Sequence, residues 1–154
     1  MDNYRKRPKD LFIFDAEWQD LYKLTEQWKS DLLFYKDDLT FLKHLIDNYF
    51  IWILKKENID IVKELDLGLI EMEGQAEDLL VRINTHLHHI AELLDNPFAY
   101  DSHTFRTEHE LLEDDISYFA MEFKRQRKEV LKITDYLIDT EEFLNKLKVG
   151  ILKG

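Results

Sequence analysis

Apolar residues recur along most of this chain at alternating steps of three and four residues. Between Ala16 and Lys56, neither glycine nor proline interrupts the chain, and ten of the eleven positions on this stepping are apolar. Such a repeat puts one continuous apolar stripe along a helix and is typical of coiled-coil packing. We therefore predict one helix over about residues 15–56, with Asp15 as its N-cap. The stripe positions are Trp18, Leu21, Thr25, Trp28, Leu32, Tyr35, Leu39, Leu42, Ile46, Tyr49 and Ile53.

The same stepping resumes twice further along the chain. It gives nine apolar positions of ten in the segment that begins at Val62, and ten of thirteen in the segment that begins at Phe105. Pro97 ends the second segment, because the residue before a proline is driven out of the helical region. We predict further helices over about residues 59–95 and 104–148.

Three helices with short connections predict an all-α fold, an elongated antiparallel three-helix bundle that runs up-down-up with coiled-coil-like packing. If both connections are hairpins, residue i of the first helix lies level with about residue 114 − i of the second, and residue j of the second with about 200 − j of the third. Asp139 with Glu142 is a capping-box pattern, and a break there would give a four-helix bundle instead.

The chain has 154 residues, and we predict one helical domain over residues 15–149. A basic arm over residues 1–14, which we expect to be flexible, precedes it. The net charge is −11, which opposes binding to nucleic acid. No segment approaches the roughly 20 apolar residues that span a bilayer. Because cysteine is also absent, we expect a cytoplasmic protein without a nucleic-acid or membrane partner.

The two glycines inside the second predicted helix, Gly68 and Gly74, each cost a helix about 1 kcal/mol relative to alanine, which indicates a bend or a close helix approach. The second helix is strongly acidic, and the third carries the basic cluster Lys124, Arg125, Arg127, Lys128 and Lys132. Glu73 and Arg127 satisfy the predicted level relation between these two helices. We therefore predict a structural salt bridge between Glu73 and Arg127 that favours the antiparallel register.

Polar residues occupy a few of the stripe positions: Thr25, His86, His109 and Gln126. A buried imidazole needs a hydrogen-bond partner, so we expect His86 and His109 each to have one, and the predicted levels put Thr25 at the same end of the bundle as both histidines. The interpretation that we prefer is a polar layer that fixes the register of a long bundle. On this interpretation, no cofactor is expected.

The alternative is a divalent metal site at the same end of the bundle. His86, His89 and His109 would be nitrogen ligands, and Glu113 or Glu92 would supply an oxygen ligand. These ligand types suit Zn²⁺ or Fe²⁺. The spacings are common on helices, so they identify no metalloprotein family.

A second apolar stripe lies on the first predicted helix, away from the first stripe. Phe34, Phe41, Leu45 and Trp52 fall within about 40° on a helical wheel. This stripe either broadens the contact with the neighbouring helices or is an interaction face, since exposed apolar strips usually meet a partner. We predict a homodimer, or another protein partner, on this stripe.

Residues that support enzyme chemistry are scarce. The serines, Ser30, Ser102 and Ser117, lie in no nucleophile-elbow motif, and the four glycines form no phosphate-binding loop. The sequence therefore predicts a non-enzymatic helical interaction or assembly module that self-associates. The alternative function is a metal-binding helical bundle.

Overall fold

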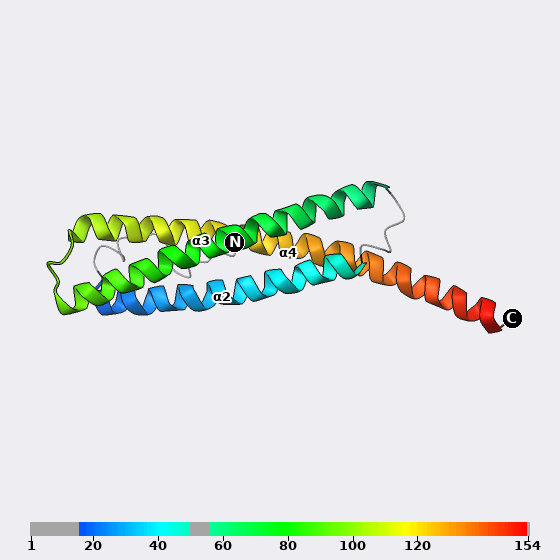
Figure 1. Ribbon diagram of the computed structural model, residues 1–154, viewed down its shortest axis with the longest axis horizontal. Helices are drawn as coiled ribbons and strands as arrows, with labels where there is room; N and C mark the ends of the chain where they lie inside the picture. Colours follow the sequence, from blue (N-terminus) through cyan, green and yellow to red (C-terminus); the bar gives the residue numbers. More distant parts are fainter. Residues whose placement is uncertain (1–15, 50–55, 154) are drawn as a thin grey trace.

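A computed structural model describes the backbone of residues 16–49 and 56–153 and the side chains of residues 16–48 and 59–135. The described chain forms three helices: α2 (Trp18–Tyr49), α3 (Lys56–Asp95) and α4 (Ser102–Lys153) (Figure 1). All three helix pairs are in contact, and the described part of the chain contains no strand. The prediction of an all-helical bundle is therefore confirmed.

The helix bounds differ from the predicted ones in several places. The helix α3 begins at Lys56, three residues before the predicted start, and α4 begins at Ser102, two residues early. The helix α4 continues through Asp139 to Lys153 without a break, so the four-helix alternative is wrong for this structure. Its C-terminal part extends beyond the end of α2 (Figure 1). The predicted arm, residues 1–14, lies outside the described residues.

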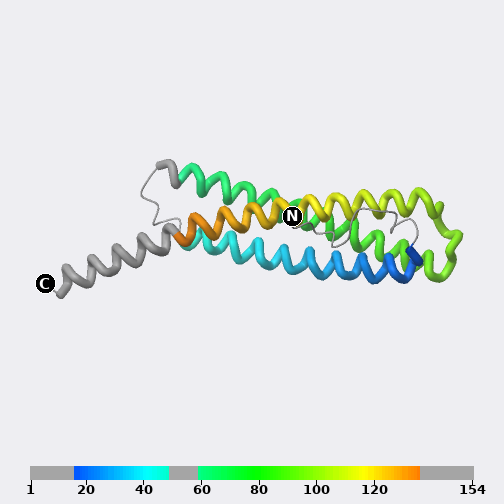
Figure 2. The backbone as a smooth tube through the Cα atoms, turned by 180° about the vertical axis from the view of Figure 1, so that it is seen from behind, coloured from blue at the N-terminus to red at the C-terminus, as the bar shows by residue number. Residues whose placement is uncertain are grey.

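Side chains satisfy backbone N–H groups in the short connection between α3 and α4. Asn96 and Phe98 are the two neighbours of Pro97, and the side-chain oxygen of Asn96 accepts a hydrogen bond from the backbone N–H of Phe98 at 3.1 Å. Asp101 is the N-cap of α4, and its Oδ1 accepts from the backbone N–H of Thr104 at 2.8 Å. Figure 2 shows that this connection lies at the same end of the molecule as the start of α2.

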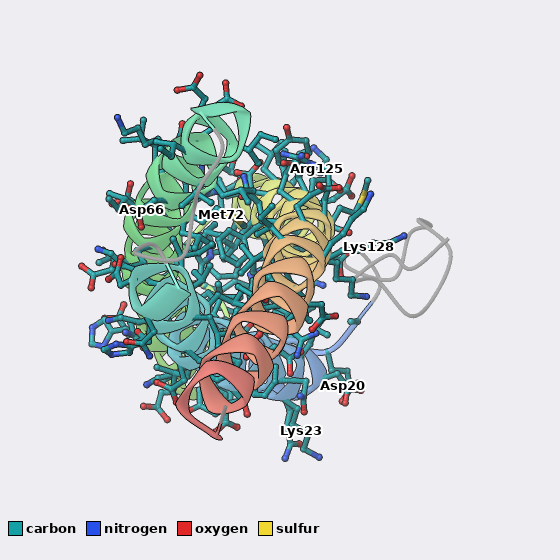
Figure 3. All side chains as sticks on the ribbon, turned by 90° about the vertical axis from the view of Figure 1, so that its right-hand side faces the viewer. Asp20, Lys23, Asp66, Met72, Arg125 and Lys128 are labelled. Atoms are coloured by element: carbon teal, nitrogen blue, oxygen red, sulfur yellow. The ribbon has the colours of Figure 1, made fainter. Side chains whose placement is uncertain are left out.

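The apolar stripe forms the core, as the repeat predicts. Figure 3 shows Met72 inside the bundle, whereas Asp20 and Lys23 point outward. Burial of one such side chain contributes about 1.5–3 kcal/mol, so the stripe is the main source of stability. Within the described residues, no helix is long and apolar enough to cross a membrane. The buried stripe residues include Leu21, Trp28, Leu32, Leu39, Leu42, Ile46, Val62, Leu69, Met72, Ala76, Leu79, Ile83, Ile90, Leu93, Phe105, Leu112, Ile116, Phe119, Phe123 and Val130.

Contacts between helices give the levels at which they meet. Between α2 and α3, Lys36 Nζ lies 2.9 Å from Glu77 Oε1, one residue from the predicted level. Between α3 and α4, Arg82 donates to Asp115 at 2.7 Å, three residues from the predicted level. The earlier start of α4 accounts for most of this second shift.

The structure does not bring Glu73 and Arg127 together. Arg127 instead lies toward α2, where its Nε donates to Asp38 Oδ2 at 2.9 Å. A residue beside the stripe of one helix in a three-helix bundle can face either neighbour, and the seven-residue pattern does not decide which. The pair predicted between α3 and α4 is thus replaced by a pair between α2 and α4.

The two glycines of α3 have different surroundings. A Cβ atom at Gly68 would lie 2.6 Å from Nε2 and 2.9 Å from Oε1 of Gln126 on α4. A Cβ atom at Gly74 would meet nothing within 4 Å. The close helix approach is therefore at Gly68, and no described contact requires glycine at position 74.

Replacing Gly74 with alanine is expected to raise the free energy of unfolding by about 1 kcal/mol, the difference in helix propensity. Gly68→Ala should gain less or lose stability, because the new methyl group displaces the Gln126 amide. Urea unfolding monitored by circular dichroism measures both changes. Equal gains at the two positions would contradict the close approach at Gly68.

The pair between Arg127 and Asp38 is tested by charge reversal. Arg127→Glu is expected to lower the free energy of unfolding by up to about 1 kcal/mol, as for other solvent-exposed pairs. Adding Asp38→Arg should restore part of the loss, whereas adding Glu73→Arg should not. If stability recovers when Glu73→Arg is added to Arg127→Glu, but not when Asp38→Arg is added, the result would instead support the pair predicted from the sequence.

Candidate functional site

One polar side chain from each helix meets inside the bundle. Thr25 of α2 and His109 of α4 are completely buried, and His86 of α3 is partly buried. We call these three residues the polar layer. They come together because Thr25, His86 and His109 all occupy positions on the apolar stripes of their helices.

Hydrogen bonds assign the protons within the polar layer. The Thr25 hydroxyl donates to the backbone carbonyl of Leu21 at 2.7 Å, so its oxygen is left to accept. His109 Nε2, 3.0 Å away, therefore carries a proton and donates to Thr25. The other ring nitrogen, His109 Nδ1, then accepts from His86 Nδ1 at 3.5 Å. His109 is therefore neutral in this arrangement, and His86 acts as a donor through its Nδ1.

Aromatic rings enclose the two histidines. The ring of Trp28 lies 4.9 Å from that of His109, and Phe105 stacks on His109 at 5.8 Å with an interplanar angle of 19°. Phe105 also contacts His86 at 5.2 Å between ring centroids. The surroundings are therefore apolar and disfavour a charged imidazole.

The histidine pKa values follow from this burial. Burial, and then the neighbouring His86 and Arg106, lower the pKa of His109 to about 3. Burial, and then His89 and Arg82, lower the pKa of His86 to about 4. Both rings therefore remain neutral at neutral pH, in agreement with the proton positions that the hydrogen bonds assign.

The structure does not assemble the predicted metal ligands into one centre. The ring centroid of His89 lies 6.3 Å from that of His86 and only 4.8 Å from that of Tyr100. Glu113 is buried on α4, one turn beyond His109, both of whose ring nitrogens are engaged. Among the residues whose side chains are described, no group of three or more His, Asp or Glu could hold a metal ion. The Zn²⁺ or Fe²⁺ site thus receives no support from the geometry.

Glu92, the alternative oxygen ligand, belongs to a separate surface cluster. His88 Nε2 lies 2.8 Å from its carboxylate, and the Tyr100 hydroxyl donates to the same carboxylate. The hydrogen bond from Tyr100 is the main cause that lowers the pKa of Glu92. This cluster ties the end of α3 to the connection that follows it.

The second apolar stripe is only partly buried by the fold. Phe34 keeps 64% and Phe41 keeps 49% of its surface exposed, whereas Leu45 packs partly against the core. Trp52 lies outside the described residues. Two interpretations of this stripe were a broader contact between helices and an interaction face. The broader contact accounts for Leu45, but it does not account for Phe34 and Phe41, which stay at the surface.

Charged residues of α2 and α4 border these two phenylalanines. Asp38, between Phe34 and Phe41 on the same side of α2, pairs with Arg127 of α4. Lys124 and Lys128, which flank Arg127 on α4, are exposed, and Figure 3 shows Lys128 on the opposite side of the bundle from Asp66 of α3. We call Phe34, Phe41, Lys124 and Lys128 the aromatic face.

A groove between α3 and α4 was not predicted from the sequence. It has a volume of about 260 Å³, with Leu79 and Phe119 as its apolar floor. Its rim carries Asp78 and Tyr118 together with the Arg82–Asp115 pair. Its formation depends on which residues of α3 and α4 face each other, which no repeat within one helix specifies.

Exposed apolar residues continue from this groove along α3. Leu67, Gly74 and Val81 recur every seven residues and thus lie on one face of the helix, and Val81 is 65% exposed. Tyr118, across the groove on α4, is also 65% exposed. The sequence did contain this signal, as a seven-residue repeat offset from the core stripe.

Acidic residues line the same side of α3. Glu71 and Asp78, also seven residues apart, lie next to this apolar line and are exposed. We call Leu67, Glu71, Gly74, Asp78, Val81 and Tyr118 the acidic face.

Comparison with known proteins identifies no relative: no protein-family model, curated protein or solved structure matches this chain.

The polar layer predicts that acid destabilises the fold. Because the folded-state pKa values of His86 and His109 lie below the unfolded value of about 6.5, the unfolded chain binds more protons as the pH falls. This contribution to stability is thus full above pH 6.5 and is lost as the pH falls from 6.5 toward the folded-state pKa values of about 4 for His86 and about 3 for His109. At pH 5 the expected loss is about 2 kcal/mol from His109, and less from the partly solvated His86.

Urea unfolding between pH 7.5 and 5 measures this loss, in a range above most carboxylate titrations. His109→Gln retains donors and an acceptor but does not titrate, and it should reduce the dependence on pH. His44→Gln replaces an exposed imidazole of α2 and serves as the control. An unchanged slope in His109→Gln would contradict the assignment.

Proposed function

We propose that this chain is a non-enzymatic interaction module that self-associates through the aromatic face. The observation that carries the proposal is that Phe34 and Phe41 stay 64% and 49% exposed after the fold has buried its core. Exposed aromatic residues in a row along a helix are typical of protein contacts, in which aromatic side chains often supply most of the binding energy.

The shape of the molecule supports this role. Our proposal includes an up-down-up course of the three helices with coiled-coil-like packing, supported by the seven-residue repeat and by the level of the Lys36–Glu77 pair. A rod of this kind offers long helix faces to a partner. The proposed place of action is the cytoplasm, with which a chain that has no cysteine is compatible.

The polar layer fits a structural role better than a catalytic one in this proposal. Its three groups bond to one another, and Thr25 and His109 are completely buried, so a substrate has no access to these two. Catalytic groups need contact with substrate, whereas buried groups that satisfy one another stabilise one arrangement of helices.

Sedimentation velocity at high micromolar concentration tests self-association. The native chain should sediment as species larger than a monomer, and Phe34→Glu with Phe41→Glu should shift it to the monomer. The two introduced glutamate side chains would lose their hydration at the contact and find no oppositely charged partner there, and this cost opposes binding.

Leu33→Glu is the matched control. Leu33 is 46% exposed and precedes Phe34 in the sequence. Consecutive residues point in different directions around a helix, so Leu33 lies on another face of α2. It should leave self-association unchanged. A native chain that is strictly monomeric, or equal effects of the Phe and Leu33 substitutions, would contradict the proposal.

A further inference from the structure

We infer that the aromatic face of one copy binds the acidic face of the next copy, so that the chain assembles head to tail through two different surfaces. This inference rests on the proposed function, since it requires self-association, and it identifies the partner surface. The partner is a second copy of this chain.

Charge complementarity is the first argument for this pairing. The aromatic face carries Lys124 and Lys128, and among the described residues neither forms an ion pair. The acidic face carries Glu71 and Asp78, which likewise form none. Contact between the two faces brings opposite charges together, whereas contact between two acidic faces brings like charges together.

Shape is the second argument. Phe34 and Phe41 are seven residues apart, a rise of about 10.5 Å along α2. On α3, Gly74 precedes the groove residues Asp78 and Arg82 by one to two turns, so the two features have a similar separation. One phenyl ring can then lie over the open space at Gly74 while the other enters the groove.

The groove is large enough for a phenyl ring. An apolar cavity of about 150 Å³ accommodates benzene, and this groove has a volume of about 260 Å³. Its floor, Leu79 and Phe119, is apolar and would pack against the ring. Tyr118 beside it offers a further aromatic contact.

The pairing also explains glycine at position 74. A Cβ atom there would meet nothing within 4 Å in this chain, so glycine relieves no contact within the molecule. At an interface, the missing side chain lets a neighbouring side chain approach the helix backbone. The cost in helix propensity is then offset by the contact with the next copy.

A symmetric contact of two aromatic faces would leave the acidic face uncovered. Val81 and Tyr118, each 65% exposed, would then remain in solvent in every copy. A head-to-tail contact buries both apolar surfaces at once. Since the two faces lie on different sides of α4, each copy can bind one neighbour with each face, and the assembly continues beyond a dimer.

Mixing two variants tests this arrangement. The first variant, Phe34→Glu with Phe41→Glu, loses the aromatic face. The second, Val81→Lys with Tyr118→Lys, loses the acidic face. Each variant alone should sediment as a monomer, because its one intact face has nothing to bind. An equimolar mixture should form a heterodimer and no larger species, while the native chain forms larger species.

Circular dichroism and thermal unfolding check that both variants fold, which the exposure of all four side chains favours. Leu94→Lys introduces one lysine at another exposed position of α3 and should associate like the native chain.

The outcomes separate this inference from the proposed function. If the native chain is a monomer, both are overturned. If the native chain associates but the second variant associates equally well, or if the mixture contains only monomers, the head-to-tail contact is overturned and self-association stands.

Discussion

The structure depends on the burial of three apolar stripes against one another. A helix with one apolar stripe gains most of its stability in a protein from packing of that stripe, which would remain solvated in the isolated helix. Each helix here has two neighbours, and residues such as Leu39, Ile83 and Leu112 become completely buried only where all three meet. Packing within the bundle is therefore the main source of helix stability.

The polar layer makes one register of the three helices more stable than registers that are shifted along the bundle. Leucine and isoleucine positions tolerate a slide of one helical turn, since another apolar residue takes the place of the first. His109 does not, because its N–H would lose the Thr25 hydroxyl and remain buried without an acceptor. Such a loss costs about 1–3 kcal/mol, which is enough to disfavour a shifted register. Neutral imidazoles satisfy this requirement without burying a charge.

The outer surfaces follow from the same geometry. Once the main stripe is buried, apolar residues elsewhere on each helix remain exposed, Phe34 and Phe41 on α2 and Val81 on α3. Lys124 and Lys128 of the aromatic face and Glu71 and Asp78 of the acidic face have opposite signs. In the assembly that we propose, these two faces bind each other, and the buried histidines contribute to the fold that presents them.

The sequence by itself determined that the chain folds as helices and which residues form the core. The seven-residue repeat is local, and buried positions such as Trp28, Met72 and Phe119 could be identified from it. The sequence also indicated that Thr25, His86 and His109 lie at one end of the bundle. Only the tertiary structure decided the direction of Arg127, the Arg82–Asp115 pair and the groove beside it. These depend on the rotation and level of one helix against two others, which arise from packing of the whole bundle and leave no periodic signal in one helix.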